Sequence, residues 1–188
     1  MILCDQDIKN EMVAGNIVID PFQEEFMQPA SVDLHLGEYF LRFKDTCNMI
    51  DVKEPLDEMM EEWHIAEGKV VKMKPGDFLL GMTAETVGVN GKIAARMDGK
   101  SSLGRIGLFI HITAGFIDPG NKLKLTLELF NASGRPIYLY PGMPIAQVSF
   151  HLMSNEVVNQ YGNGKLNSKY YGAEKPQASQ FYKNYKRV

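Results

Sequence analysis

Apolar and polar residues alternate most regularly between positions 122 and 131. Leucines occupy every second position from 123 to 129, and the residues between them are Lys124, Thr126 and Glu128. Because successive side chains of a β-strand point to opposite faces, this pattern predicts a strand whose leucine face packs on a core. Glu128 is then held rigidly and directed away from that core. Most glutamates in such positions are solvated surface residues, so the pattern alone does not make Glu128 functional.

Short apolar runs bounded by glycine, proline or asparagine recur along most of the chain, at a spacing of about ten residues. We predict further strands at 16–20, 31–43, 69–73, 78–85, 92–97, 137–140 and 145–153. The pattern from Asp5 to Ala14 is typical of a short helix with Asp5 as its N-cap and Gly15 as its end. Gly88, before Asn90-Gly91, is expected to separate two strands. We therefore predict a mainly β fold, a sandwich or barrel, with a short N-terminal helix.

Two segments depart from this alternation. Asp51 to Glu67 carries seven carboxylates against Lys53, which predicts an exposed loop or a short helix. After Asn155 the chain becomes polar and rich in Gly, Asn, Lys and Tyr. We divide the chain into a single β domain at 1–160 and a basic C-terminal tail at 161–188. The tail is either a solvated terminus or a lid over an anionic substrate. Its charged residues are Lys165, Lys169, Lys175, Lys183, Lys186 and Arg187 against Glu174 alone.

Composition and charge exclude several classes of protein. The net charge of -3 argues against a general nucleic-acid binder. The two cysteines, Cys4 and Cys47, form neither a disulfide framework nor a zinc motif. No charged-then-apolar leader opens the sequence, and no apolar run approaches the ~18 residues of a membrane span. We therefore expect a cytoplasmic protein without membrane or nucleic-acid partners.

The histidines form no recognisable metal or catalytic pattern. Neither His-x-Glu nor His-x-x-x-His occurs, so we interpret each as a surface or hydrogen-bonded histidine rather than a ligand. The four are His35, His64, His111 and His151.

Three other positions are candidates for chemistry. The run from Lys100 to Arg105 places two serine hydroxyls and a guanidinium around a flexible glycine, an arrangement that suits an anion. The run from Thr113 to Gly120 reads as a turn with the Asp118 carboxylate at its rim. Asp33 is either a structural polar residue or a site residue, and the sequence leaves both interpretations open.

Several motifs in a fixed order resemble those of the dCTP deaminases, a family of the trimeric dUTPase superfamily. The resemblance extends from Met1 to about Gly172 and is strongest to the bifunctional, dUMP-forming type. The motifs are Gln-Pro-Ala-Ser-Val-Asp-Leu at 28–34, Lys-Ser-Ser-Leu-Gly-Arg at 100–105, Thr-Ala-Gly-Phe-Ile-Asp-Pro-Gly at 113–120, Thr-Leu-Glu-Leu-Phe-Asn at 126–131 and Pro-Gly-Met-Pro-Ile-Ala-Gln at 141–147.

This resemblance implies a distorted β-barrel of the dUTPase-like (β-clip) type, assembled as a homotrimer with shared active sites. It implies a hydrolase of pyrimidine deoxyribonucleotide biosynthesis that deaminates dCTP and cleaves the triphosphate, giving dUMP, diphosphate and ammonia. Zinc deaminases use His-x-Glu and Pro-Cys-x-x-Cys. Neither pattern occurs here, so we expect metal-free water activation, no zinc, and Mg²⁺ bound only through substrate phosphates. Expected ligands are dCTP and dUTP, with dTTP as an inhibitor.

The resemblance also implies roles for individual residues. Glu128 would deprotonate the water that attacks C4 of cytosine. Ser101 and Arg105, from a neighbouring subunit, would position that water and the pyrimidine, and Asp118 would contact the sugar. The remaining implied substrate-binding residues are Lys100, Ser102, Leu103, Gly104, Thr126, Leu127, Gln147, Tyr161 and Lys169.

The bifunctional type is suggested by small Gly115 followed by Phe116. A small residue there leaves room for a second water near the α-phosphate, which Asp118 would orient. The sequence departs from the family at Asn121, where an aromatic residue is common, at Leu123, where glycine is common, and at Ala173, near a usual glutamine. Three alternatives stay open: a monofunctional deaminase releasing dUTP, a dUTPase only, and a non-catalytic nucleotide-binding regulatory trimer.

Overall fold

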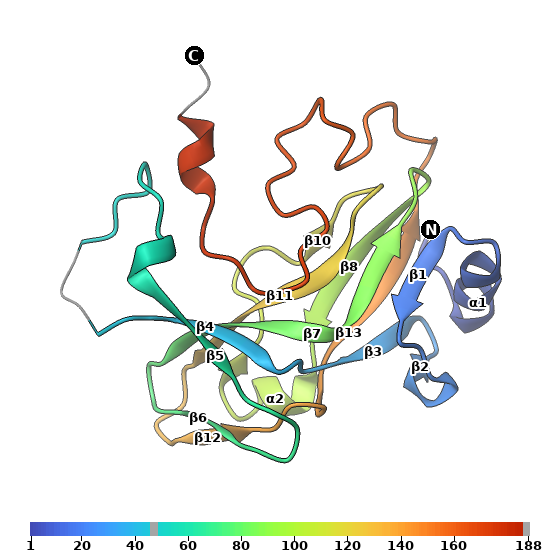
Figure 1. The fold of residues 1–188 in the computed structure, drawn as a ribbon. Helices are drawn as coiled ribbons and strands as arrows, with labels where there is room; N and C mark the ends of the chain where they lie inside the picture. Colours follow the sequence, from blue (N-terminus) through green and yellow to red (C-terminus); the bar gives the residue numbers. More distant parts are fainter. Residues whose placement is uncertain (46–48, 186–188) are drawn as a thin grey trace.

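The computed structural model describes residues 1–45 and 49–185 and confirms a mainly β fold with a short N-terminal helix (Figure 1). Cys47, Lys186 and Arg187 lie outside the described residues. The helices are α1 (Asp5–Val13), the single turn α2 (Ser101–Gly104), and 3-10 segments at Glu24–Phe26, Asp57–Met59 and Phe181–Asn184. The strands are β1 (Ile17–Asp20), β2 (Met27–Gln28), β3 (Ser31–His35), β4 (Tyr39–Phe43), β5 (Met60–His64), β6 (Val71–Met73), β7 (Phe78–Val89), β8 (Ile93–Gly99), β9 (Leu108–Phe109), β10 (Phe116–Ile117), β11 (Lys122–Asn131), β12 (Ile137–Leu139) and β13 (Pro144–Leu152).

The strands form two large antiparallel sheets and one small one. The first sheet has the order β5-β4-β7-β11-β9, with β1 paired to β7, and the second has the order β10-β8-β13-β3-β2. Strands β12 and β6 form a separate pair. The described strands do not close into a single barrel, so the predicted barrel is realised as distorted, open sheets that enclose one apolar core.

Strand β11 has the predicted two-residue periodicity. Its leucines are all buried, whereas Lys124, Thr126 and Glu128 are only partly buried. The strand lies in the middle of its sheet, with β7 on one side and β9 at the end of the other side. Glu128 is therefore fixed on a central strand and directed away from the core.

The acidic segment was predicted incorrectly. Instead of only an exposed loop or short helix, it contains β5, which pairs with β4 in register from Tyr39 with His64 to Phe43 with Met60. Leu56 and Met60 are buried in a small second cluster of apolar side chains. The strand is hard to recognise in the sequence because its exposed positions carry carboxylates. Only one face of such an edge strand needs apolar residues. Arg42, whose guanidinium covers the Trp63 ring and pairs with Glu61, compensates part of the charge.

Two element boundaries also differ from the prediction. Strand β7 continues through Gly88 to Val89, because this stretch pairs with β1 on one side and β11 on the other. Helix α1 begins at Asp5 itself, and Cys4 is its N-cap residue. Within the described ranges, no helix has both the length and the apolar character needed to cross a membrane.

The segment after residue 160 has little regular structure but packs on the β domain. Tyr161 N–H donates to the Pro119 carbonyl at 2.9 Å, and Lys124 N–H donates to the Ala173 carbonyl at 2.9 Å. Ala173 belongs to the main core, and Ala178 to the second cluster with Leu56 and Met60. This segment, red in Figure 1, passes along β11 towards the β4–β5 hairpin.

Candidate active site

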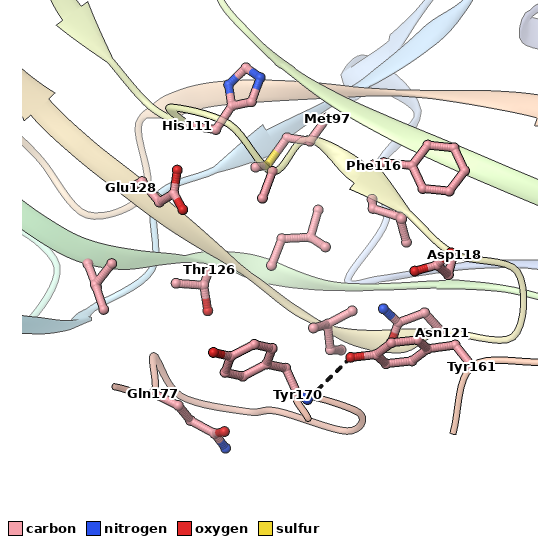
Figure 2. Close-up of a pocket in the computed structure, with 15 residues that line it drawn as sticks. Met97, His111, Phe116, Asp118, Asn121, Thr126, Glu128, Tyr161, Tyr170 and Gln177 are labelled. Atoms are coloured by element: carbon pink, nitrogen blue, oxygen red, sulfur yellow. Dashed lines mark hydrogen bonds between the residues drawn. The ribbon is translucent and has the colours of Figure 1, made fainter. Parts of the chain in front are cut away.

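A pocket lies over the polar face of β11, between the loop that precedes β10 and the C-terminal segment (Figure 2). Five of the predicted site residues line it together: Asp118, Thr126, Glu128, Tyr161 and Phe116. The other lining residues are Leu80, Met97, His111, Ala114, Ile117, Asn121, Leu123, Leu125, Tyr170 and Gln177.

The Glu128 carboxylate is held by backbone donors of the loop before β10. Its Oε2 accepts the Ile112 N–H at 2.7 Å and the Thr113 N–H at 3.3 Å. The Glu128 N–H donates to the Ile110 carbonyl at 2.9 Å. Oε1 accepts no hydrogen bond from the described residues. The carboxylate thus has a fixed direction and one oxygen available to a water or a ligand.

The edge of β11 beside Glu128 offers backbone groups to the pocket. On the side away from β7, Lys124 N–H binds the Ala173 carbonyl and Glu128 N–H binds the Ile110 carbonyl. Since every second N–H of a strand points to the same edge, the Thr126 N–H and carbonyl point into the gap between these two contacts. A flat ring with its own donors and acceptors can pair with this free edge, as a further strand would.

Asp118 and the tyrosines form the other end of the pocket. Asp118 is exposed, and its carbonyl accepts the Asn121 N–H at 3.1 Å, which closes the predicted turn. Tyr161 Oη accepts the Tyr170 N–H at 3.3 Å. Asn121 is 8% exposed, and its Oδ1 has no partner among the described residues. A small, buried amide thus stands where the resemblance predicts an aromatic residue.

Gly115 is small for a reason that the sequence alone did not reveal. A Cβ there would lie 2.6 Å from the Met97 carbonyl oxygen and 3.0 Å from His111 Cδ2. The Gly115 carbonyl also accepts the Met97 N–H at 2.8 Å. Any larger residue must displace the loop that holds Glu128, so packing requires glycine here in addition to the predicted need for space near the α-phosphate.

The Lys100 to Arg105 run lies elsewhere in this chain. It forms α2 and its flanks, in which Ser101, Ser102, Gly104 and Arg105 are exposed, and none of its residues is among those that line the pocket. In Figure 1, α2 lies at the bottom of the molecule, whereas most of the C-terminal segment lies at the top. Leu103 packs partly against the core. The sequence motif is thus correctly placed on a turn, but one chain does not bring it to Glu128.

Lys100 already has a partner. Its Nζ donates to Asp33 Oδ2 at 2.6 Å, with 29% and 14% of the two side chains exposed. The second oxygen of Asp33 is buried and unpaired. Gln147 lies directly across from Asp33 on β13 and accepts a hydrogen bond from the Ser31 hydroxyl at 3.5 Å. Asp33 therefore holds the lysine at the start of the Lys100 to Arg105 run, a structural contact that leaves a further role of Asp33 in the site as a prediction.

The pocket also contains residues that the sequence did not single out. His111, interpreted as structural, lies beside Glu128 (Figure 2). Tyr170 and Gln177 reach the pocket from the tail. Tyr170 and Gln177 lie outside the sequence motifs, and the packing of the tail on β11, where the Lys124 N–H donates to the Ala173 carbonyl, brings them to the pocket. Conversely, Leu127 is fully buried and offers only its backbone, and Lys169 is half-buried in the tail without lining the pocket.

Comparisons with known proteins identify the family of this chain. A family model described as dCTP deaminase-like matches residues 2–153. The chain is 42% identical over 187 residues to the dCTP deaminase, dUMP-forming, of Corynebacterium kroppenstedtii, a match that covers 99% of this chain and 100% of that relative. It is 43% identical over 189 residues to the protein of the same name from Tropheryma whipplei, covering 100% of this chain and 96% of that relative.

A solved structure has the same fold. The 2'-deoxycytidine 5'-triphosphate deaminase from Agrobacterium tumefaciens matches with a TM-score of 0.62 at 23% identity, over 81% of this chain and 48% of that chain. This chain therefore spans about half the length of that protein.

Proposed function

The chain belongs to the dCTP deaminase-like family, and we propose that it deaminates dCTP and cleaves the triphosphate to give dUMP, diphosphate and ammonia. The observation that carries this proposal is the fixed Glu128 carboxylate, with one free oxygen, beside the open backbone edge at Thr126. The edge supplies donors and acceptors for a cytosine ring, and Glu128 supplies the base. The names of the two bacterial relatives support the dUMP-forming reaction.

Deamination requires proton transfers that one carboxylate can perform. Glu128 takes a proton from a water, whose oxygen bonds to C4 of the cytosine. Glu128 gives this proton to N3, then takes the proton of the new C4 hydroxyl and delivers it to the amino group. The tetrahedral carbon collapses to the C4 carbonyl, the C4–N bond breaks, and ammonia leaves. The Ile112 and Thr113 N–H groups keep the carboxylate aimed at this position. Ser101 and Arg105 position the water and the pyrimidine.

The second step is attack of another water on the α-phosphorus, with diphosphate as the leaving group. Asp118 lines the pocket beside the tyrosines and would orient this water, and Phe116 lines the pocket with the buried Gly115 directly before it. Mg²⁺ bound to the substrate would neutralise part of the triphosphate charge. Substrate is further held by Gln147, Tyr161, Lys169 and the run from Lys100. dTTP competes for the same pocket as an inhibitor.

The site is shared between subunits of a homotrimer. Glu128 and Asp118 share one pocket, whereas Ser101 and Arg105 are exposed on α2 and do not line it. In a symmetric trimer, α2 of one subunit would cover the pocket of the next. Each of the three pockets would then be completed in the same way.

Product analysis tests the proposed reaction directly. The protein is incubated with dCTP and Mg²⁺, and nucleotides, diphosphate and ammonia are quantified over time. We expect dUMP, diphosphate and ammonia in equal amounts, without accumulation of dUTP.

Each other outcome selects a different function. Ammonia with accumulating dUTP would leave a deaminase without triphosphate cleavage. Cleavage of added dUTP without ammonia release from dCTP would indicate a dUTPase. Binding of dCTP without any product would favour a regulatory trimer.

The tail from 161 to 188 acts as a lid on this pocket. Lys175 Nζ donates to Glu62 at 2.9 Å and lies 4.2 Å from the centre of the Tyr39 ring, both on the β4–β5 hairpin. The Gln180 N–H donates to Tyr170 Oη at 2.9 Å, so docking on the hairpin also fixes a pocket residue. Ala178 anchors the docked segment among Leu56 and Met60.

The charge contact in the lid depends on pH. The hydrogen bond with Glu62, with desolvation opposing it, raises the pKa of Lys175 above its ordinary value of 10.5. The contact is therefore complete below that value and is lost as the pH rises through the raised pKa. Docking is intact at neutral pH.

Replacing Ala178 by aspartate should undock the lid. A carboxylate cannot be buried in the apolar cluster without a partner, so we expect KM for dCTP to increase about tenfold, equivalent to roughly 1.4 kcal/mol. Limited proteolysis should cut the tail faster, with the melting temperature of the body unchanged. Ser179→Asp adds the same charge at the adjacent, exposed position and should behave as wild type. Equal KM values for the two variants would contradict the docking role.

A further inference from the structure

Strands β7 and β11 change register in the middle of their pairing. Lys124 pairs with Thr86, but Thr126 pairs with Met82. Leu125 therefore lies opposite three residues of β7, positions 83–85. In an uninterrupted ladder Thr126 would lie two residues away, about 7 Å along β7. This interruption decides where on the sheet the part of β11 beyond it, including Glu128, is placed.

The Thr83 hydroxyl replaces the backbone partner that the interruption removes. Leu125 N–H donates to Thr83 Oγ1 at 2.9 Å, and this hydroxyl donates to the Glu85 carbonyl at 2.7 Å. Thr83 has no exposed surface, so bulk water has no access to either backbone group. Buried backbone groups are almost always paired. The register shift thus requires a side chain that both accepts and donates, as threonine and serine do and valine does not.

The irregular segment is also fixed from the side opposite β11. The Glu85 carboxylate is buried, accepts the His35 backbone N–H at 2.9 Å and contacts His35 Nδ1 at 2.6 Å. Gly37 N–H donates to the Met82 carbonyl at 2.8 Å. β7 is therefore anchored to the β3–β4 turn on one side, while Thr83 transmits its position to β11 on the other.

We infer that Thr83 is a positioning residue for Glu128, acting through the register of β11. This role rests on the proposed deamination. Thr126 and Glu128 pair with Met82 and Leu80, directly beyond the interruption. The contact from Ile112 N–H to the Glu128 carboxylate and the free edge at Thr126 both depend on this register. Thr83 does not line the pocket, so its loss removes no side-chain contact with the substrate and acts only through the position of β11.

Steady-state kinetics of ammonia release from dCTP test this role. Thr83→Val keeps the shape but removes both hydrogen bonds, and a misplaced catalytic group costs about 10- to 100-fold in rate. We expect kcat to fall by that amount, with KM within about threefold of wild type. Thr83→Ser should stay within about threefold of the wild-type kcat. Thr86→Val is the matched control, since this half-buried residue of β7 pairs regularly with Lys124 and should leave kcat unchanged.

If the Thr83→Val variant does not fold, comparison of two other variants, Thr83→Ser and Thr83→Ala, still tests the role of the hydroxyl. Thr83→Ser and Thr83→Ala differ by one oxygen, so their kcat ratio reports the hydroxyl alone. Hydrogen exchange adds an independent readout, because the Leu125 amide should exchange faster in the alanine variant than in the serine variant.

The outcomes separate this role from the proposed reaction. Equal kcat values for the serine and alanine variants, or a valine variant within about twofold of wild type, would overturn the role of Thr83 while the deaminase stands. A wild-type protein that releases no ammonia from dCTP would overturn the proposed function, and this role with it.

Discussion

Replacing Glu128 by glutamine is expected to lower the rate of ammonia release from dCTP by about a thousandfold. Glutamine keeps the shape and can still accept the Ile112 N–H, which in the wild type reaches Oε2 at 2.7 Å. It cannot take a proton from the attacking water. We therefore expect dCTP to bind within about threefold of the wild-type Kd, as measured by isothermal titration calorimetry.

Two comparisons make the Glu128→Gln result specific. Glu25→Gln changes the same charge at an exposed position and should retain full activity. Cleavage of dUTP supplied directly should survive in Glu128→Gln better than deamination, because that reaction does not use this base. Ammonia release above about a tenth of the wild-type rate would remove Glu128 from the catalytic role.

Mixing two inactive variants should restore activity if the site is shared between subunits. Arg105→Ala and Glu128→Gln homotrimers are each expected to release ammonia at least about a hundredfold more slowly than wild type. In mixed trimers some sites combine an intact Glu128 with an intact Arg105 from the neighbour. Every mixed trimer has one such site among its three, so purified mixed trimers should recover about a third of the wild-type rate.

The complementation experiment needs separately tagged chains. Co-expressed chains carrying two different affinity tags are purified over both, so that only mixed assemblies are assayed. A chain carrying both substitutions, co-expressed with wild type, serves as the control for simple subunit dilution. Mixed assemblies no more active than the single variants would show that Arg105 and Glu128 do not meet across an interface.

Strands in which apolar and polar residues alternate regularly were predictable from the sequence. Strands in which charged residues interrupt this alternation were not. Strand β11 follows from its alternating leucines because one of its faces is fully buried. Strand β5 was missed, since its core contact depends on Met60 and on pairing with β4, while its other positions carry charge. The local sequence indicates which side chains are exposed to solvent. It does not indicate which distant segment a strand pairs with.

The same distinction holds for the site. Glu128, Thr126 and Asp118 lie on motifs, and the structure places all three in one pocket. His111 lies two residues before the motif at 113–120 but was interpreted as a structural histidine, and Tyr170 lies in the tail outside the motifs; both line the pocket. Thr83 is less visible still, because its role comes from a register shift between two strands that are some forty residues apart.

The contact between Lys100 and Asp33 has a consequence for nucleotide capture. A lysine that already has an internal counterion at 2.6 Å contributes little to the electric field far from the protein. It becomes attractive only when an anion is close enough to replace the carboxylate. In the proposed site, Lys100 would therefore act on the triphosphate only at short range, and recruitment of the nucleotide from bulk solution would depend on exposed charges such as Arg105. Ionic strength should consequently affect the rate of nucleotide association through Arg105 far more than through Lys100.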